Sequence, residues 1–290
     1  MIIDDNGILV YEQNVTIGSE FHEKREKPAL LRELTHDPTH QINWETPYYN
    51  KFIDESLVGM DLSKMTILDL GCADGRFTEY LVNKGIGKVI CVDSHYPPLY
   101  NLLKYSEEKG FRDKITLINC GADNVPIDND SVDVVLAMGV FYYLGDLHKD
   151  GIKNMYNKLK DGGILLSSEP NKEGLALRSL IFNGLNDMID NFINGTFKEE
   201  QGETKYNFYL LNEKEILSLY SDLGFELQKK RGLSIFHQLI RIKHVKGEIT
   251  KHELEKNLVN LRTIFDGLDV DGNFNKTILY KHVKQKGGSK

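Results

Sequence analysis

The chain has 290 residues, of which 40% are hydrophobic and 27% are charged, a balance typical of a globular protein. Its formal net charge of −7 weighs against an extended nucleic-acid-binding face, which usually carries a basic excess. No apolar run approaches the roughly 20 residues of a membrane span, and the first residues lack the basic and apolar regions of a signal peptide. We therefore expect a cytoplasmic protein with no membrane partner, and nucleic acid is not an expected partner.

The first 60 residues are predicted to form a cap. Strand-like residues 8–11 and 15–17 favour a hairpin, which could also pair with a second copy in a homodimer. Pro47 suits the first turn of a helix that Thr46 caps and that runs to about residue 57. Three aromatic side chains are candidates for a substrate-binding lid, with packing of this helix as the alternative: Trp44, Tyr48 and Tyr49.

Strands and helices alternate through the next part of the chain, which favours a parallel sheet with helices on both faces. The strands are near-continuous apolar runs, as buried parallel strands usually are. We expect strands at 65–70, 88–93, 115–119, 132–138 and 163–169, and helices at 75–84, 97–109 and 147–160.

Residues 170–211 interrupt this rhythm and are predicted to form an insertion or lid. A helix is expected at 175–193, followed by a polar and aromatic cover at 195–209. Asn212 and Glu215 then form an N-cap and N3 pair that begins another helix. Two further strands (224–227 and 235–242), a helix (248–266) and a frayed basic tail (281–290) complete the expected elements. The predicted units are 1–60, 61–245 and 246–290.

The most informative stretch joins the strand at 65–70 to the helix behind it. It contains Asp69, Gly71, Ala73 and Gly75, and it resembles motif I, D-x-G-x-G-x-G, of the class I S-adenosylmethionine (SAM) dependent methyltransferases. Ala73 stands where the middle glycine usually lies, which is a mild departure. Glycine permits positive φ angles and a close approach of ligand to backbone. Asp69, at the end of a buried strand, is well placed to accept hydrogen bonds from an ammonium group.

Three further motifs follow in the order that this resemblance implies. Asp93 ends the second strand about twenty residues past the glycine turn, where an acidic residue usually binds a ribose diol. In the resembled family, the acidic residue at Asp123 accepts a hydrogen bond from the adenine amino group, and Ala122 offers its backbone N–H to the ring. Met138 ends the fourth strand and completes the expected cofactor site.

The resemblance implies SAM as the cofactor and a Rossmann-like, doubly wound α/β fold. Its sheet would have seven strands with an antiparallel closing hairpin, which the two strands at 224–227 and 235–242 would form. The N-terminal cap and the helical insertion would be added to this core.

Charge also argues against a dinucleotide or a nucleoside triphosphate. The glycines at 71 and 75 do not form the G-x-G-x-x-G pattern that brings backbone against a pyrophosphate, and Asp74 between them would repel one. A metal site is not expected, because no C-x-x-C occurs and Cys72, Cys91 and Cys120 are best explained as buried thiols. A calcium-loop-like start at residue 269 has no glycine at its sixth position and no glutamate at its twelfth.

Methyl transfer from SAM is an in-line displacement, so the enzyme must align the reacting atoms, exclude water and remove any acceptor proton. Tyr142 and Tyr143 follow the fourth strand, and the sequence does not say which of them faces the site. His148 is a candidate general base by residue type, because histidine side chains ordinarily titrate near neutrality, and a solvent-facing histidine is the alternative. Glu169 ends the fifth strand, where it could bind substrate or instead form a cap or salt bridge.

The sequence therefore predicts a SAM-dependent methyltransferase that acts on a small molecule, with oxygen slightly favoured over nitrogen or carbon as acceptor. A second possibility is a tRNA- or RNA-modifying enzyme, because residues 138–143 are similar to a stretch in tRNA-wobble-modifying relatives. A third is a non-catalytic SAM-binding module, for which Ala73 leaves room.

Overall fold

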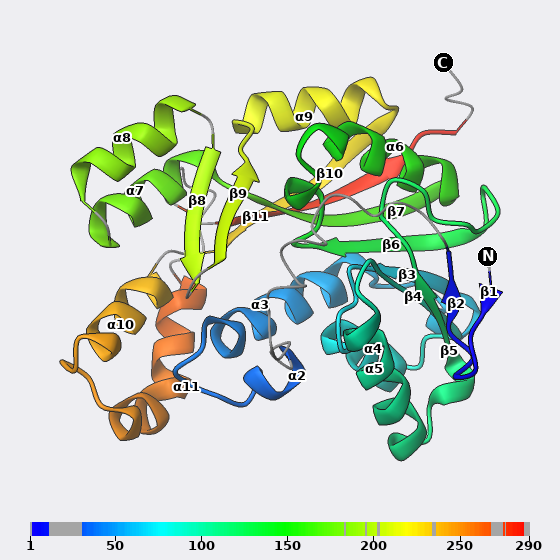
Figure 1. Cartoon of the computed structure of the whole chain (residues 1–290), viewed down its shortest axis with the longest axis horizontal. Coiled ribbons are helices and arrows are strands. Elements are labelled where there is room, and N and C mark those ends of the chain that lie inside the picture. Colours follow the sequence, from blue (N-terminus) through cyan, green and yellow to red (C-terminus); the bar gives the residue numbers. More distant parts are fainter. Residues whose placement is uncertain are drawn as a thin grey trace.

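A nine-stranded sheet organises the computed structural model, which describes residues 2–11, 31–182, 184–194, 196–201, 204–233, 236–267, 275 and 277–286. The strand order is β1-β2-β5-β4-β3-β6-β7-β11-β10 (Figure 1). The six strands from β2 to β7 along this order are parallel, and β11 is antiparallel to both of its neighbours. The strands are β1 (Ile2–Ile3), β2 (Leu9–Val10), β3 (Thr66–Leu70), β4 (Lys88–Asp93), β5 (Ile115–Asn119), β6 (Val132–Met138), β7 (Leu159–Pro170), β10 (Phe225–Leu233) and β11 (Thr277–Lys284).

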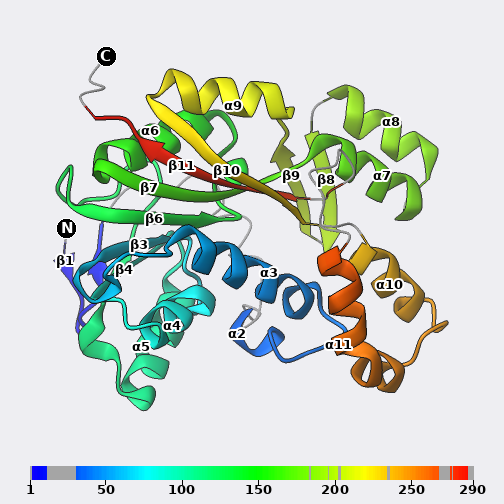
Figure 2. The ribbon, with the colours of Figure 1, turned by 180° about the vertical axis from the view of Figure 1, so that it is seen from behind.

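Helices cover both faces of the sheet (Figures 1 and 2). Successive side chains of a strand point to opposite faces, so Ile67 and Leu68 of β3 enter two separate cores. One face carries α3 (Gln41–Ser56), α4 (Arg76–Asn83) and α5 (Tyr96–Lys109), and the other carries α6 (His148–Lys158) and α9 (Glu213–Asp222). Short 3-10 turns connect the elements: η1 (Leu62–Lys64), η2 (Arg112–Lys114) and η3 (Phe141–Leu147). The predicted doubly wound α/β architecture is confirmed.

The expected closing hairpin is wrong. Residues 236–242, part of the predicted second strand, lie in helix α10 (Phe236–Val245), and residue 235 lies outside the described residues. The partner of β10 is instead β11, whose second half (281–284) belongs to the segment expected to be a frayed tail. Lys284 can occupy this buried position because its amine donates to the Leu159 carbonyl at 2.7 Å and to the Asp130 carboxylate at 2.6 Å. The closing pair is therefore antiparallel, but a long segment separates its strands.

The N-terminal strands extend the sheet rather than stand apart from it. β1 pairs antiparallel with β2, and β2 pairs in parallel with β5, so the strand count rises to nine. The Asp4 carboxylate turns the chain between the strands by accepting the N–H groups of Asn6 and Ile8. The strand expected at 15–17 lies outside the described residues, and residues 8–11 pair with the preceding strand β1 instead.

Helix α3 begins six residues before the position that the sequence predicts, with His40 as its N-cap. Pro47 therefore lies inside the helix, where it cannot donate to the carbonyl of Asn43. Arg262, from α11 (Lys251–Gly267), replaces this donor, because its Nη2 atom lies 3.0 Å from that carbonyl. A tertiary contact thus allows the helix to continue through proline.

The insertion after β7 consists of two helices and a two-stranded hairpin. The helix predicted at 175–193 is divided into α7 (Lys172–Phe182) and α8 (Leu185–Asn194), with Gly184 at a φ of 104° between them. The polar segment expected as a cover forms β8 (Thr196–Gln201) and β9 (Thr204–Tyr209), and β9 packs on η3. The reciprocal capping pair predicted for Asn212 and Glu215 is confirmed at the start of α9.

The remaining helices pack near the N-terminal end of α3. α2 (Leu31–Leu34) and α10 contact α3, and α10 contacts α11. α10 and α11 lie near the end of the β8–β9 hairpin (Figure 2). The helix predicted at 248–266 is confirmed as α11. Of the helices that the structure describes, none combines the length and apolar composition required to cross a membrane.

Candidate active site

A tight glycine turn connects β3 to α4 at the carboxyl edge of the sheet. Gly71 and Gly75 have φ angles of 69° and 93°, which side chains rarely permit. The N–H groups of Gly71 and Cys72 both donate to the Val92 carbonyl, at 2.7 and 3.0 Å, so the turn is fixed to the end of β4. A Cβ atom on Gly71 would lie 2.7 Å from Val140, which explains why a glycine is needed there.

Asp93 holds the turn in place before any ligand binds. Ala73 adopts a φ of 47°, an unusual angle for a non-glycine residue, and its N–H donates to Asp93 at 2.8 Å. The second carboxylate oxygen accepts the N–H of His95 at 2.9 Å. The sequence predicts only a ribose contact for Asp93, and that contact stays a prediction. The structure adds a role in bracing the glycine turn.

Asp69 lies beneath the turn with only 2% of its surface exposed. It accepts a hydrogen bond from the Thr78 hydroxyl at 2.7 Å, which links β3 to α4. Burial raises the pKa of Asp69 to about 7 because it disfavours the charged carboxylate. The predicted contact between Asp69 and a ligand ammonium group stays a prediction.

The Asp74 carboxylate points toward α2, not into the turn. It is buried and accepts the backbone N–H of Arg32 at 3.2 and 3.3 Å. The Arg32 guanidinium donates to the Asp74 carbonyl at 3.2 Å and lies 3.4 Å from the centre of the Tyr105 ring. Burial raises the pKa of Asp74. The expectation that this charge faces the ligand is therefore corrected.

The ends of β5 and β6 bring the remaining predicted cofactor residues to the same edge of the sheet. Ala122 is buried and Asp123 is half-buried in the loop after β5, and Met138 is half-buried at the end of β6. Asn154 of α6 donates to the Asp123 carbonyl at 2.5 Å and so orders this loop. Because β4, β5 and β6 are parallel, the sequence could place these residues together from their positions at strand ends.

Tyr142 and Tyr143 lie side by side in η3, with ring centres 4.5 Å apart. Tyr143 is 37% exposed, whereas Tyr142 is turned inward and burial raises its pKa well above the usual value. A Cβ atom on Gly139 would lie 3.3 Å from the Tyr142 hydroxyl. Tyr142 is therefore the neighbour that faces the end of β6, which the sequence leaves open.

His148 and Glu169 form a buried pair beneath η3. The His148 Nε2 and Glu169 Oε1 atoms are 3.6 Å apart, and the two side chains are 4% and 1% exposed. Phe141 stacks against the His148 ring, and Tyr220 donates to Glu169 at 3.0 Å. A solvent-facing His148 is thus excluded. The sequence gives no signal for Tyr220, because it lies 51 residues from its partner and meets it only through the packing of α9.

The three aromatic candidates of α3 separate. Trp44 is buried against Leu254 of α11 and donates to the Pro38 carbonyl at 2.7 Å, which favours the packing role over substrate binding. Tyr48 reaches the carbonyl of Arg262 at 3.3 Å. Tyr49 contacts the start of α4, with its ring centre 5.6 Å from that of Phe77. Of the three, Tyr49 is the one that the structure places beside the glycine turn.

The three cysteines that the sequence singles out all lie in the described part of the chain. Cys72, Cys91 and Cys120 are buried free thiols. Among the described residues, no group of three or more His, Cys, Asp or Glu side chains is arranged to hold a metal ion. Of the calcium-loop-like segment at 269–275, only residue 275 belongs to the described residues.

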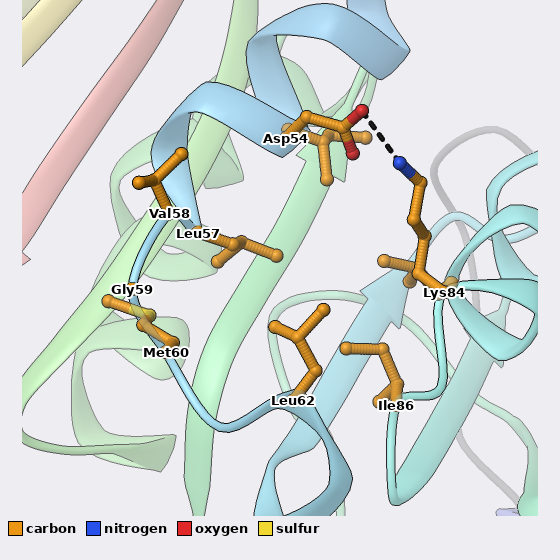
Figure 3. Close-up of a pocket in the computed structure, with 10 residues that line it drawn as sticks. Asp54, Leu57, Val58, Gly59, Met60, Leu62, Lys84 and Ile86 are labelled. Atoms are coloured by element: carbon orange, nitrogen blue, oxygen red, sulfur yellow. Dashed lines mark hydrogen bonds and ion pairs between the residues drawn. The ribbon is translucent and has the colours of Figure 1, made fainter.

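A pocket of about 340 Å³ lies at the opposite end of the sheet and is separate from this site (Figure 3). Leu57, Leu62 and Ile86 line it, and an ion pair of 2.8 Å between Asp54 and Lys84 stands at its rim. α4 begins at the glycine turn and ends near this pocket, so the two places are a helix length apart.

The strand order, the glycine turn after β3 and the carboxylates after the next strands together define a class I SAM-dependent methyltransferase. The comparisons with known proteins agree. Residues 68–167, which span β3 to β7, match the family model described as a methyltransferase domain. The chain therefore carries a SAM-dependent methyltransferase domain and is an enzyme of this class.

Individual relatives are distant. The chain is 21% identical to the tRNA 5-carboxymethoxyuridine methyltransferase of Escherichia coli (strain K12), over 70% of this chain and 76% of the relative. It is 36% identical to a carboxy-S-adenosyl-L-methionine synthase of Desulforapulum autotrophicum, over 37% of this chain and 44% of the relative. A crystal structure described as a SAM-dependent methyltransferase from Listeria monocytogenes shares its fold, with a TM-score of 0.57, 17% identity, and coverage of 82% of this chain and all of the other.

Proposed function

We propose that this methyltransferase transfers a methyl group from SAM to an oxygen atom of a small molecule. The observation that carries the proposal is the cover over the end of β6. β9, from the insertion, packs on η3, which holds Tyr142, and α3 places the buried Tyr49 near the glycine turn. An enclosed site suits a small acceptor, because methyl transfer benefits from excluding water. The acidic net charge of −7 supports the same acceptor class.

The buried His148–Glu169 pair supports oxygen as the acceptor atom. SAM, when bound, would supply the methyl group as the acceptor oxygen forms its bond to the methyl carbon, and S-adenosylhomocysteine would leave with the electron pair of the broken carbon–sulfur bond on its sulfur. The hydroxyl proton passes to His148, and Glu169, 3.6 Å away, stabilises the imidazolium that forms. Tyr220 holds Glu169 in position by donating to it.

A tRNA acceptor is the second candidate, and one relative favours it. The matched Escherichia coli protein is named for methylating 5-carboxymethoxyuridine in tRNA, and the match covers 70% of this chain. A tRNA-binding surface would carry clustered basic residues, and its affinity would fall steeply with salt. The match to a methyltransferase domain favours an enzyme over the third possibility, a non-catalytic SAM-binding module.

Methyl-labelled SAM distinguishes the acceptor classes. The enzyme is incubated with the labelled cofactor and either the low-molecular-weight filtrate of a cell extract or total tRNA. We expect label in the small-molecule fraction and weak, salt-insensitive retention of tRNA. Label in tRNA, with binding that decreases steeply with salt, would instead establish the second candidate.

The base assignment is tested with His148→Gln. This change should lower kcat by roughly 10²- to 10⁴-fold while S-adenosylhomocysteine still binds, because a general base acts on the chemical step. Unchanged turnover in this variant would remove His148 from the mechanism.

A further inference from the structure

Arg76 carries a positive charge that the protein alone leaves incompletely satisfied. It is the first residue of α4 and directly follows Gly75 of the glycine turn. Its Nε atom donates to the Thr46 hydroxyl at 3.0 Å, but its buried Nη2 atom has no hydrogen-bond partner among the residues that the structure describes. Buried donors are almost always paired, so an unpaired one indicates a missing partner.

The nearby acidic groups do not supply this partner. Glu45 and Asp74 attract Arg76 electrostatically, but neither accepts a hydrogen bond from its Nη2 atom. The Asp74 carboxylate is directed instead at the backbone of Arg32. Burial lowers the pKa of Arg76, because a desolvated cation is disfavoured.

The guanidinium is held in one orientation by aromatic rings. Its central carbon lies 4.7 Å from the ring centre of Phe77 and 5.1 Å from that of Tyr49. These contacts, together with the bond to Thr46, restrict the side chain before a ligand arrives. A fixed planar guanidinium is suited to a carboxylate, which accepts two N–H groups at once.

The position of Arg76 indicates which carboxylate it meets. α4 begins at this residue, so the helix N-terminus adds a partial positive charge and unpaired N–H groups at the same place. The glycine turn beside it leaves Gly71 exposed, and the resemblance of this turn to motif I implies that the cofactor lies over it. The methionine tail of SAM ends in a carboxylate and an ammonium group.

We propose that Arg76 binds the carboxylate of the cofactor's methionine tail. Binding supplies the acceptor that Nη2 lacks and neutralises the buried cation. Because Arg76 is bonded to Thr46 and stacked on Tyr49, the same contact connects the cofactor to α3. Arg76 thereby selects cofactors that retain the methionine carboxylate.

Calorimetry with two ligands and two proteins tests this contact directly. The ligands are S-adenosylhomocysteine and the same molecule without its carboxylate, and the proteins are the wild type and Arg76→Gln. We expect Arg76→Gln to weaken S-adenosylhomocysteine roughly 10- to 100-fold, the effect of losing a charge-assisted hydrogen bond. The decarboxylated ligand should bind both proteins equally. Arg76→Lys should recover part of the loss, because it restores the charge but not the planar fork.

Lys84→Gln is the matched control. It removes a cation from the residue that caps the other end of α4, at an exposed pair with Asp54, and should leave the affinity for S-adenosylhomocysteine unchanged. Equal affinity of the wild type and Arg76→Gln for S-adenosylhomocysteine would overturn the proposal, as would an equal loss for both ligands. If Arg76→Gln does not fold, the comparison of the two ligands on the wild type still tests the proposal. Equal affinity of the wild type for both ligands would exclude a contact between Arg76 and the carboxylate.

These measurements use no acceptor, so their outcome is independent of the proposed small-molecule function. An Arg76 that binds the acceptor's carboxylate instead would leave both ligands unaffected by the substitution and would raise only the KM of the acceptor. That result counts against the proposal.

Discussion

Replacement of Asp93 by alanine should separate the folding and cofactor-binding contributions of one carboxylate. Its two oxygens accept the N–H groups of Ala73 and His95 at 2.8 and 2.9 Å. Alanine leaves both donors without this partner, and Ala73 then has to keep a φ of 47° without it. The glycine turn should therefore loosen even when no ligand is present.

The magnitude follows from the two hydrogen bonds. A bond to a charged acceptor contributes about 1.5–3 kcal/mol, and the Asp93 side chain is only 11% exposed. Water can replace part of this contribution once the turn loosens, so we expect Asp93→Ala to lower the free energy of unfolding by about 2–4 kcal/mol. If Asp93 also binds the ribose diol, the affinity for S-adenosylhomocysteine should fall by roughly 10- to 100-fold.

Urea unfolding and calorimetry measure the two effects, and Asp133→Ala is the control. Asp133 accepts the N–H of Thr66 at 2.8 Å at the opposite end of β3 and pairs with Lys160. Its removal should also lower stability but should leave S-adenosylhomocysteine binding unchanged. The reasoning is refuted if Asp93→Ala retains wild-type stability, and the ribose assignment fails if the variant keeps wild-type affinity.

Three further changes test buried groups elsewhere in the chain. The folded-state pKa of Asp69 is about 7, above its ordinary value, so its contribution to stability is present at low pH and is lost as pH rises toward 7. The free energy of unfolding of the wild type should therefore fall by up to about 1.4 kcal/mol per pH unit over this range, and that of Asp69→Asn should not. Parallel pH profiles of the two proteins would contradict this prediction. Burial lowers the pKa of His282 to about 4, so its contribution to stability is present above its ordinary pKa and is lost as pH falls toward 4. The free energy of unfolding of His282→Phe should not show this decrease at acid pH. An acid profile equal to that of the wild type would contradict this prediction. Arg262→Ala should lower the free energy of unfolding by about 1–3 kcal/mol, because the Asn43 carbonyl beside Pro47 loses its donor, and wild-type stability would show that water replaces it.

The parallel core could be predicted because the apolar composition of each strand reflects the burial of that strand. β3 and β6 are buried on both faces, so their apolar runs carry the information that places them. The spacing from the glycine turn to Asp93 identifies the second strand end in the same way. Local signals also sufficed for the capping pair that begins α9.

The closing strand could not be predicted, because polar side chains conceal it. β11 contains His282 and Lys284, which are buried but suggest an exposed tail when read from the sequence. Their environment depends on distant partners, since Lys284 donates to Leu159 and His282 stacks on Tyr220 with ring centres 4.2 Å apart. Residues 235–242, of which five are apolar, by contrast fit a strand or a helix, and the structure forms helix α10 from residue 236.

The residues of the candidate site also fall into those that the sequence predicts and those that it does not. Residues at strand ends, such as Asp93 and Met138, follow from the order of the motifs. The roles of Arg76 and Tyr220 do not, because each depends on a contact with a distant segment, α3 for Arg76 and β7 for Tyr220. An arginine after a glycine turn does not by itself predict a ligand contact, and the contacts with Thr46 and Tyr49 are visible only in the structure.

The structure also changes the reason why this turn should reject a pyrophosphate. The sequence argument relied on repulsion by Asp74, but that carboxylate is buried against α2. The reason lies instead in the backbone N–H groups of the glycine turn. A phosphate-binding turn directs its backbone donors at the ligand, whereas here the N–H of Ala73 is bound by Asp93 and those of Gly71 and Cys72 by the Val92 carbonyl. Three N–H donors of the turn are therefore already used inside the protein, and a cofactor with a single carboxylate makes a smaller demand that Arg76 can meet.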